Sequence, residues 1–123
     1  MDAELNKGPL WDRTKKFALR VIQLYARLPE TRVGQVIGGQ VLRSGTSPGA
    51  HYREACRARS RAEFISKMAG GLQELEETVY WFELLTEGRI IRPDLIEDLH
   101  NEANELIAMF VASINTAHGN KNS

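Results

Sequence analysis

The sequence predicts an all-α protein, an antiparallel up-and-down four-helix bundle with a kinked second helix. In four segments, apolar residues recur at spacings of three and four, and Pro, Gly and capping residues separate these segments. No segment alternates apolar and polar residues over a useful length, so no strand is expected. A chain of 123 residues has room for one domain, covering residues 1–123. Four helices joined by short links would pack antiparallel.

The first helix is expected over about residues 10–28, because Pro29 cannot continue it. Its apolar positions, at spacings of four, three and four, are Phe17, Val21, Leu24 and Leu28.

The second helix is expected over about residues 31–58. Its apolar positions are Val33, Val36, Ile37 and Val41. Ser47 could cap a new helix with Pro48 at its first position, or one long helix could kink at Pro48. No polar loop separates the two halves, which favours the kinked helix.

The third helix is expected over residues 60–87. Ser60 and Glu63 form a capping box at its start, and Gly88 suits the C′ position after its end. Its apolar stripe is Phe64, Met68, Leu72, Leu75, Val79 and Phe82.

The fourth helix is expected over residues 93–117, with Pro93 in its first turn. Its apolar stripe is Leu95, Leu99, Ala103, Leu106, Phe110 and Ile114. The polar tail, residues 118–123, is expected to fray. Gly38-Gly39 and Gly70-Gly71 fall inside helices, where glycine is costly, and therefore favour close approach of two helix backbones, with a flexible joint as the alternative.

Charge is distributed unevenly along a chain whose formal net charge is zero. Residues 1–67 carry thirteen Lys and Arg against six Asp and Glu, whereas residues 68–123 carry three against ten. This asymmetry favours either a polyanion partner or pairing of basic with acidic helices. One cysteine and the absence of a secretory signal or a membrane-length apolar run predict a cytoplasmic protein.

Basic residues spaced along the first two helices form a candidate nucleic-acid-binding footprint, because rows of cations can follow phosphates. The candidates are Arg13, Lys16, Arg20, Arg27, Arg53, Arg57 and Arg61. No aromatic platform interleaves the arginines, so any binding would be directed to phosphates or to shape. The alternative is a solvated basic face that pairs with the acidic third and fourth helices.

A second candidate surface lies on the third helix, where Tyr80 and Leu84 point away from the apolar stripe and Trp81 lies well off it. Aromatic residues are enriched in interfaces, so Tyr80, Trp81 and Leu84 are expected to mediate self-association. The alternative is that a neighbouring helix, or the segment around Leu10 and Trp11, covers them.

No catalytic group or cofactor is expected. A di-metal site needs two Glu-x-x-His units, and Glu97 to His100 is the one unit in the sequence, which leaves a carboxylate-bridged metal protein as a remote alternative. Cys56 lies five residues from His51, a poor spacing for an activated pair on one helix, so a buried structural thiol is expected.

The run from Leu42 to Leu85 resembles a known family. The matching stretches are Leu42 to Ala50, Glu54-Ala55, Ser60 to Lys67, Glu74, Glu77-Thr78 and Tyr80-Trp81. They are similar to bacterial four-helix-bundle proteins related to those encoded by intervening sequences in large-subunit ribosomal RNA genes. The resemblance covers about residues 17–110.

The resemblance implies a four-helix bundle that associates as a homopentamer. A distant relative, the accessory protein of diversity-generating retroelements, is a basic pentamer that binds nucleic acid and a reverse transcriptase. The chain departs from the family pattern at Pro48, His51-Tyr52, Gln73 and Glu76. The last two stand where relatives often have Lys or Arg, which weakens a nucleic-acid interpretation of the third helix.

Together these observations predict a non-enzymatic homo-oligomer, a pentamer by resemblance, that contacts RNA, DNA or a ribonucleoprotein through its basic surface and does not enter a membrane. The alternative is a protein-only assembly or accessory scaffold whose charged halves pair between subunits.

Overall fold

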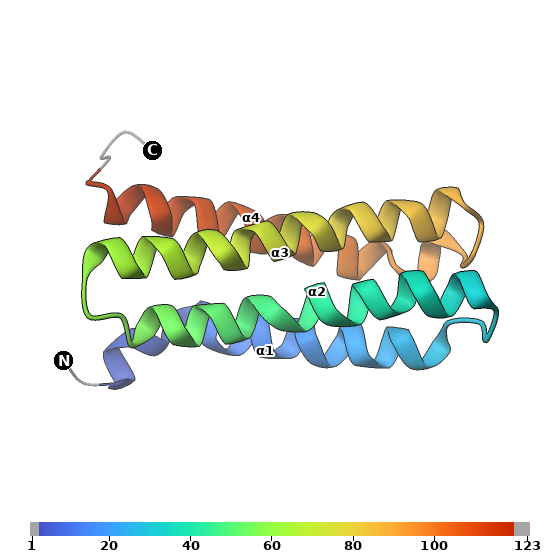
Figure 1. Cartoon of the computed structure of the whole chain (residues 1–123), viewed down its shortest axis with the longest axis horizontal. Coiled ribbons are helices and arrows are strands. Elements are labelled where there is room, and N and C mark those ends of the chain that lie inside the picture. The colour runs from blue at the N-terminus through green and yellow to red at the C-terminus, as the bar shows by residue number, and fades with distance from the viewer. Residues whose placement is uncertain (1–2, 120–123) are drawn as a thin grey trace.

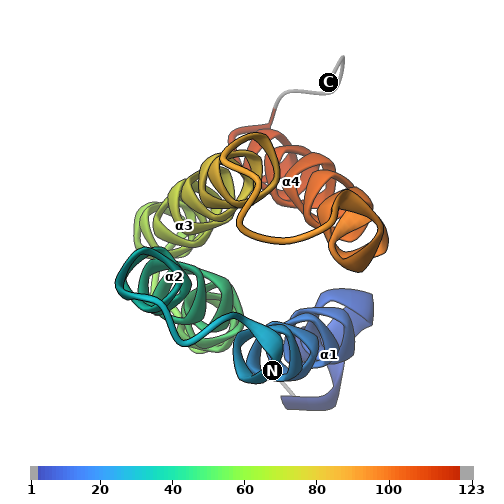
Figure 2. The same ribbon diagram turned by 90° about the vertical axis from the view of Figure 1, so that its right-hand side faces the viewer.

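Four long helices run up and down along one axis in the computed structural model (Figure 1). The structure describes residues 3–119, with the side chains of residues 8–119. The elements are α1 Ala3–Arg27, α2 Arg32–Cys56, α3 Arg61–Glu87, the short 3-10 helix η1 Pro93–Leu95 and α4 Glu97–Ala117. Seen end-on, each long helix occupies one corner, and α1 neighbours both α2 and α4 (Figure 2). Within residues 3–119 no strand is present, so the predicted fold is confirmed.

Helix α1 contains a break at Gly8, where the backbone has φ 50° and ψ −178°. Residues with a Cβ rarely adopt this conformation, and the following Pro9 favours an extended ψ before it. Pro9 then occupies the first position of the regular helix, where a missing N–H costs nothing. The predicted start at residue 10 is therefore correct for the regular part of α1.

Helix α2 continues through Pro48 without interruption of its helical backbone, as the single-helix prediction requires. Thr31 caps its start by accepting a hydrogen bond from the backbone N–H of Gly34. Ser47 does not cap a new helix, because its hydroxyl donates to the carbonyl of Arg43 one turn earlier at 2.7 Å.

The end of α3 corrects the predicted cap. Gly88 is the C-cap with φ −76°, and the left-handed C′ position is held by Arg89 with φ 58°. The N–H groups of Arg89 and Ile90 bond to the carbonyls of Thr86 and Leu85, which is the Schellman pattern. At the start of α3, Ser60 accepts from the N–H of Glu63 as predicted.

The core fills the space between the four helices with side chains of unequal size. The largest buried rings are Phe17 of α1, Phe82 of α3 and Phe110 of α4. Helix α2 instead turns a face of mostly small residues inward: Gly34, Gly38, Val41, Ser44, Gly45, Pro48 and Ala55. Val33 and Val36, two of the apolar positions by which the second helix was recognised, are consequently 55% and 60% exposed.

The glycine prediction is correct in part. Notches at Gly38, Gly45, Gly70 and Gly71 lie against neighbouring helices, but the nearest atoms belong to inserted side chains and not to a second backbone. Gly39 faces open space.

Candidate interaction surfaces

Arg13 links α1 to α4. Its guanidinium hydrogen-bonds the carboxylate of Glu102, at 2.6 Å from Nη2 to Oε1, and that of Glu105 at 3.1 Å. The hydrogen bonds that Arg13 donates to these two carboxylates, Glu102 first, raise the pKa of Arg13 above its ordinary value. One member of the predicted nucleic-acid footprint is therefore engaged in holding the bundle together.

Arg43 forms the corresponding link between α2 and α3, and the footprint prediction did not include it. Its two terminal nitrogens contact Glu74 and Glu77, each at 2.8 Å. The side-chain hydrogen bond to Glu77 is the main cause that raises the pKa of Arg43. In the sequence, Glu74 and Glu77, one helical turn apart, fit either a solvated helix face or partners for arginines, and the structure shows the second. These links pair basic with acidic helices within one chain.

The predicted cations of α1 and α2 do not all lie in one patch. Lys16, Arg20 and Arg27 are exposed, and α1 runs antiparallel to α2, so Arg27 lies at the opposite end of the bundle from Arg53. Arg20 and Arg27 line a hollow of about 230 Å³ together with Asp94 and Asp98. Acidic neighbours make this part of α1 a poor route for a polyanion.

Arg53, Arg57, Arg59 and Arg61, which we call the basic end, gather where α2 passes into α3. Arg57, Arg59 and Arg61 are exposed, and within residues 8–119 none of them forms an ion pair. Glu54, the nearest carboxylate along α2, lies 3.8 Å from Lys67 and 3.9 Å from His51. The basic end is therefore a concentration of positive charge that the fold does not neutralise.

Trp11 of α1 lies beside the basic end, a proximity that the sequence did not reveal. The guanidinium carbon of Arg53 is 4.2 Å from the centre of the Trp11 ring, which is cation–π geometry. The expectation that no aromatic platform accompanies the arginines does not hold at this position, because Trp11 reaches Arg53 from another helix.

The predicted self-association residues divide between surface and core. Tyr80 is 53% exposed, whereas Trp81 is half-buried, packs against the core and meets the Tyr80 ring edge-on at 5.1 Å between centroids. Leu84 is half-buried. The indole N–H of Trp81 is buried and has no hydrogen-bond partner among the described residues.

Two exposed valines extend this surface onto α2. The hydroxyls of Ser44 and Thr78 hydrogen-bond at 2.8 Å, and Arg43 contacts Glu77, so the antiparallel register places Val36 level with Leu84. We call Val33, Val36, Tyr80 and Leu84 the apolar strip. A second exposed apolar pair, Leu19 and Ile22, lies on the outer side of α1.

Cys56 is half-buried, and burial raises the pKa of its thiol. The neighbouring Tyr52 hydroxyl hydrogen-bonds the sulfur and has its own pKa raised by burial. An activated cysteine needs a lowered pKa, so this environment does not favour the thiolate.

The Glu97 to His100 segment was the one candidate for metal chemistry. His100 is half-buried beside the Phe82 ring, at 6.0 Å between centroids. Across the part of the chain that the structure describes, no three His, Cys, Asp or Glu side chains come together as metal ligands would. Nor does any helix in that part have the length and apolar character needed to cross a membrane.

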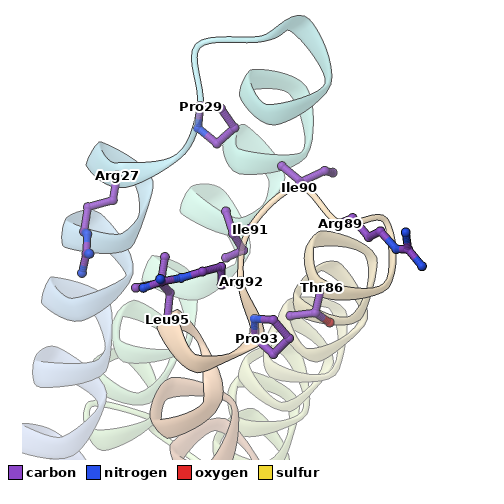
Figure 3. A pocket seen from close by; sticks show the side chains of 9 residues that line it. All are labelled: Arg27, Pro29, Thr86, Arg89, Ile90, Ile91, Arg92, Pro93 and Leu95. Atoms are coloured by element: carbon purple, nitrogen blue, oxygen red, sulfur yellow. The ribbon is translucent and has the colours of Figure 1, made fainter.

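A hollow of about 700 Å³ opens at the α3–α4 connection. Its lining residues are Arg27, Pro29, Thr86, Arg89, Ile90, Ile91, Arg92, Pro93 and Leu95. Figure 3 shows Arg89 pointing outward, away from Arg27 and Arg92. Arg92 also lies 3.3 Å from Asp94, so the arginines do not converge on one ligand.

Comparisons with known proteins agree with this architecture. A family model described as 23S rRNA-intervening sequence protein matches residues 7–112. A crystal structure of a protein with unknown function from the S23 ribosomal protein family of Bacteroides thetaiotaomicron is 37% identical, with a TM-score of 0.83. The match covers 89% of this chain and 98% of that one. None of the curated proteins compared with the chain matches it.

Proposed function

The chain belongs to the 23S rRNA-intervening sequence protein family, and from this premise we propose that it is a non-enzymatic, homo-oligomeric protein that binds nucleic acid, alone or in a ribonucleoprotein, through its basic end. The observation that carries the proposal is the division among its arginines. Arg13 and Arg43 are paired with carboxylates inside the bundle, whereas Arg57, Arg59 and Arg61 are exposed and form no ion pair within residues 8–119.

The position of the basic end supports contact with phosphates. Arg53 and Arg57 lie one turn apart, a rise of about 6 Å along the axis of α2. The positive charge is placed at the C-terminal end of α2, where it also offsets the negative end of the helix dipole. The described C-terminal part of α4, residues 106–119, which ends at the same side of the bundle, contains no carboxylate side chain to oppose it.

Self-association is the second part of the proposal. The apolar strip exposes a tyrosine and two valines on α2 and α3, and exposed apolar surface of this kind is typical of interfaces. The family resemblance makes a pentameric ring the expected assembly, and such a ring would repeat the basic end five times. Repetition raises avidity without any new contact within one subunit.

A protein-only assembly is the competing function. It is favoured by the apolar strip, because exposed apolar surface is typical of contacts with other protein chains. The two arginine links pair part of the charge within one subunit and do not themselves join subunits. A purified oligomer without nucleic-acid absorbance, and without affinity for added RNA or DNA, would support this alternative.

Salt and charge reversal test the nucleic-acid proposal. A labelled RNA of about 15 nucleotides should bind the wild-type protein at about 50 mM salt and lose at least about tenfold in affinity by about 200 mM, because phosphate contacts release counterions. The double variant Arg53→Glu/Arg57→Glu should abolish binding in a fluorescence anisotropy titration.

The matched control is Arg89→Glu/Arg92→Glu, which makes the same charge change at the opposite end of the bundle. Its affinity for the RNA should fall by no more than about twofold to threefold, because a distant charge change acts only through long-range, screened electrostatics. Equal losses in the two double variants would assign the effect to net charge and contradict the basic end as the docking site. Circular dichroism should show that all proteins remain helical.

A further inference from the structure

Trp11 and Arg53 give the basic end a flat π surface among its cations. The guanidinium and the indole ring are 4.2 Å apart, and Arg57 follows Arg53 by one turn. Resting on the function proposed above, we infer that the basic end binds single-stranded nucleic acid, with a base stacked on the Trp11–Arg53 pair and phosphates held by Arg57 and Arg61.

The chemistry of the pair favours an unpaired base. A guanidinium held against an indole is a preorganised planar group, and both arginine planes and aromatic rings stack on nucleobases. Single-strand binding sites combine such surfaces with a basic path for the backbone. In a duplex the base faces are already stacked on each other, so only the phosphates would remain for the basic end to contact.

The shape of this end also argues against reading a duplex groove. Groove readers insert a helix or a two-stranded ribbon between the phosphate backbones. Here α2 ends at Cys56 and α3 begins at Arg61, so a short link, residues 57–60, closes this corner of the bundle without a projecting element (Figure 1). The surface is suited to a flexible strand that can adapt to it.

The first test compares one sequence in two forms. A labelled RNA strand of about 15 nucleotides and its duplex with the complementary strand are titrated separately with the full chain at about 50 mM salt. The single strand should bind at least about tenfold more tightly. Equal or tighter binding of the duplex would overturn the single-strand inference and leave the proposed function standing, whereas no binding of either would overturn both.

Two variants separate stacking from charge. Trp11→Ala should weaken single-strand binding by about fivefold to a hundredfold and leave duplex binding within about twofold, because stacking contributes to one form alone. Arg53→Lys keeps the positive charge and loses the planar group, and it should show the same selective loss. If Trp11→Ala disturbs the fold, Arg53→Lys remains as the test. Wild-type affinity of the Arg53→Lys variant for the single strand would exclude stacking of a base on the Trp11–Arg53 pair.

Discussion

At the scale of single residues, arginine has three distinct uses in this chain. Arg13 and Arg43 hold carboxylates of neighbouring helices, Arg53 lies over an indole ring, and Arg57 extends from the end of α2. The residue type alone does not separate these uses, because each depends on what a second helix places nearby. The sequence therefore identifies the arginines but does not show which of them pair with carboxylates and which remain on the surface.

Arg89 occupies a backbone conformation that penalises its own side chain. A residue with a Cβ at φ 58° is strained by about 1 kcal/mol relative to glycine. Arg89→Gly should therefore raise the free energy of unfolding by about 1 kcal/mol, which corresponds to a melting temperature higher by about 4 °C. Differential scanning calorimetry measures the change.

Arg92→Gly provides the comparison for that prediction. Arg92 has an ordinary φ of −71°, so glycine there relieves no strain and adds freedom to the unfolded chain. This variant should be neutral or slightly less stable than the wild type. If Arg89→Gly shows no gain either, contacts made by the Arg89 side chain must offset the backbone strain.

At the scale of helices, α2 is distinguished by the small residues on its inner face. Val21 of α1 fits against Gly45, and the Phe110 ring of α4 fits against Gly71 of α3. Such notches let large side chains of one helix fill the space that the neighbouring helix leaves open, which keeps the core densely packed. The order of large and small residues therefore fixes how closely α1 and α2 approach.

Two alanine substitutions in α2 should have opposite signs. A Cβ on Gly45 would lie 2.8 Å from a methyl carbon of Val21, so Gly45→Ala should destabilise the protein by about 1–3 kcal/mol through overpacking. A Cβ on Gly39 meets nothing within 4 Å, so Gly39→Ala should stabilise it by about 0.5–1 kcal/mol through helix propensity. Urea denaturation of both variants measures these changes in the free energy of unfolding. If Gly45→Ala stabilises the protein, the notch at Gly45 has room for a methyl group.

The helix boundaries were predictable because their signals are local. Thr31 and Ser60 act within a turn of their own positions, and α2 and α3 begin directly after them. The predicted start of the fourth helix at Pro93 is wrong for α4, because Pro93 begins the 3-10 helix η1 and α4 begins at Glu97. The inner face of α2 was not predictable in the same way, because Val33 and Val36 have the spacing of core residues. Val33 and Val36 are exposed because α2 turns its glycines toward α1. The spacing of apolar residues within α2 cannot show which face of α2 packs against another helix.

The candidate surfaces were predictable to a similar extent. Tyr80 was identified because a helical wheel places it opposite the apolar stripe, and it is exposed. The Trp11–Arg53 contact joins residues that are far apart along the chain, so no spacing rule could have shown it. The separation of Arg27 from Arg53 likewise follows from the antiparallel course of α1 and α2.

At the scale of the whole molecule, exposed apolar residues occur on more than one side of the bundle. The apolar strip lies on α2 and α3, while Leu19 and Ile22 lie on the outer side of α1. A two-fold dimer uses one self-complementary patch, whereas a closed ring of more than two subunits joins two different patches head to tail. The two surfaces therefore favour a ring over a dimer.

This arrangement predicts which charges break the assembly. Val36→Glu/Tyr80→Glu and Leu19→Glu/Ile22→Glu should each convert the oligomer to monomer, because either change buries unpaired carboxylates at every contact of a ring. Val111→Glu, on the exposed side of α4, should leave the assembly intact. Multi-angle light scattering measures the mass of the assembly, and a pentamer has five times the mass of one chain.

Loss of assembly in the Val36→Glu/Tyr80→Glu variant alone would indicate a two-fold dimer built on the apolar strip. A monomeric wild-type protein would remove self-association from the proposed function. The test of the basic end would be unchanged by that result.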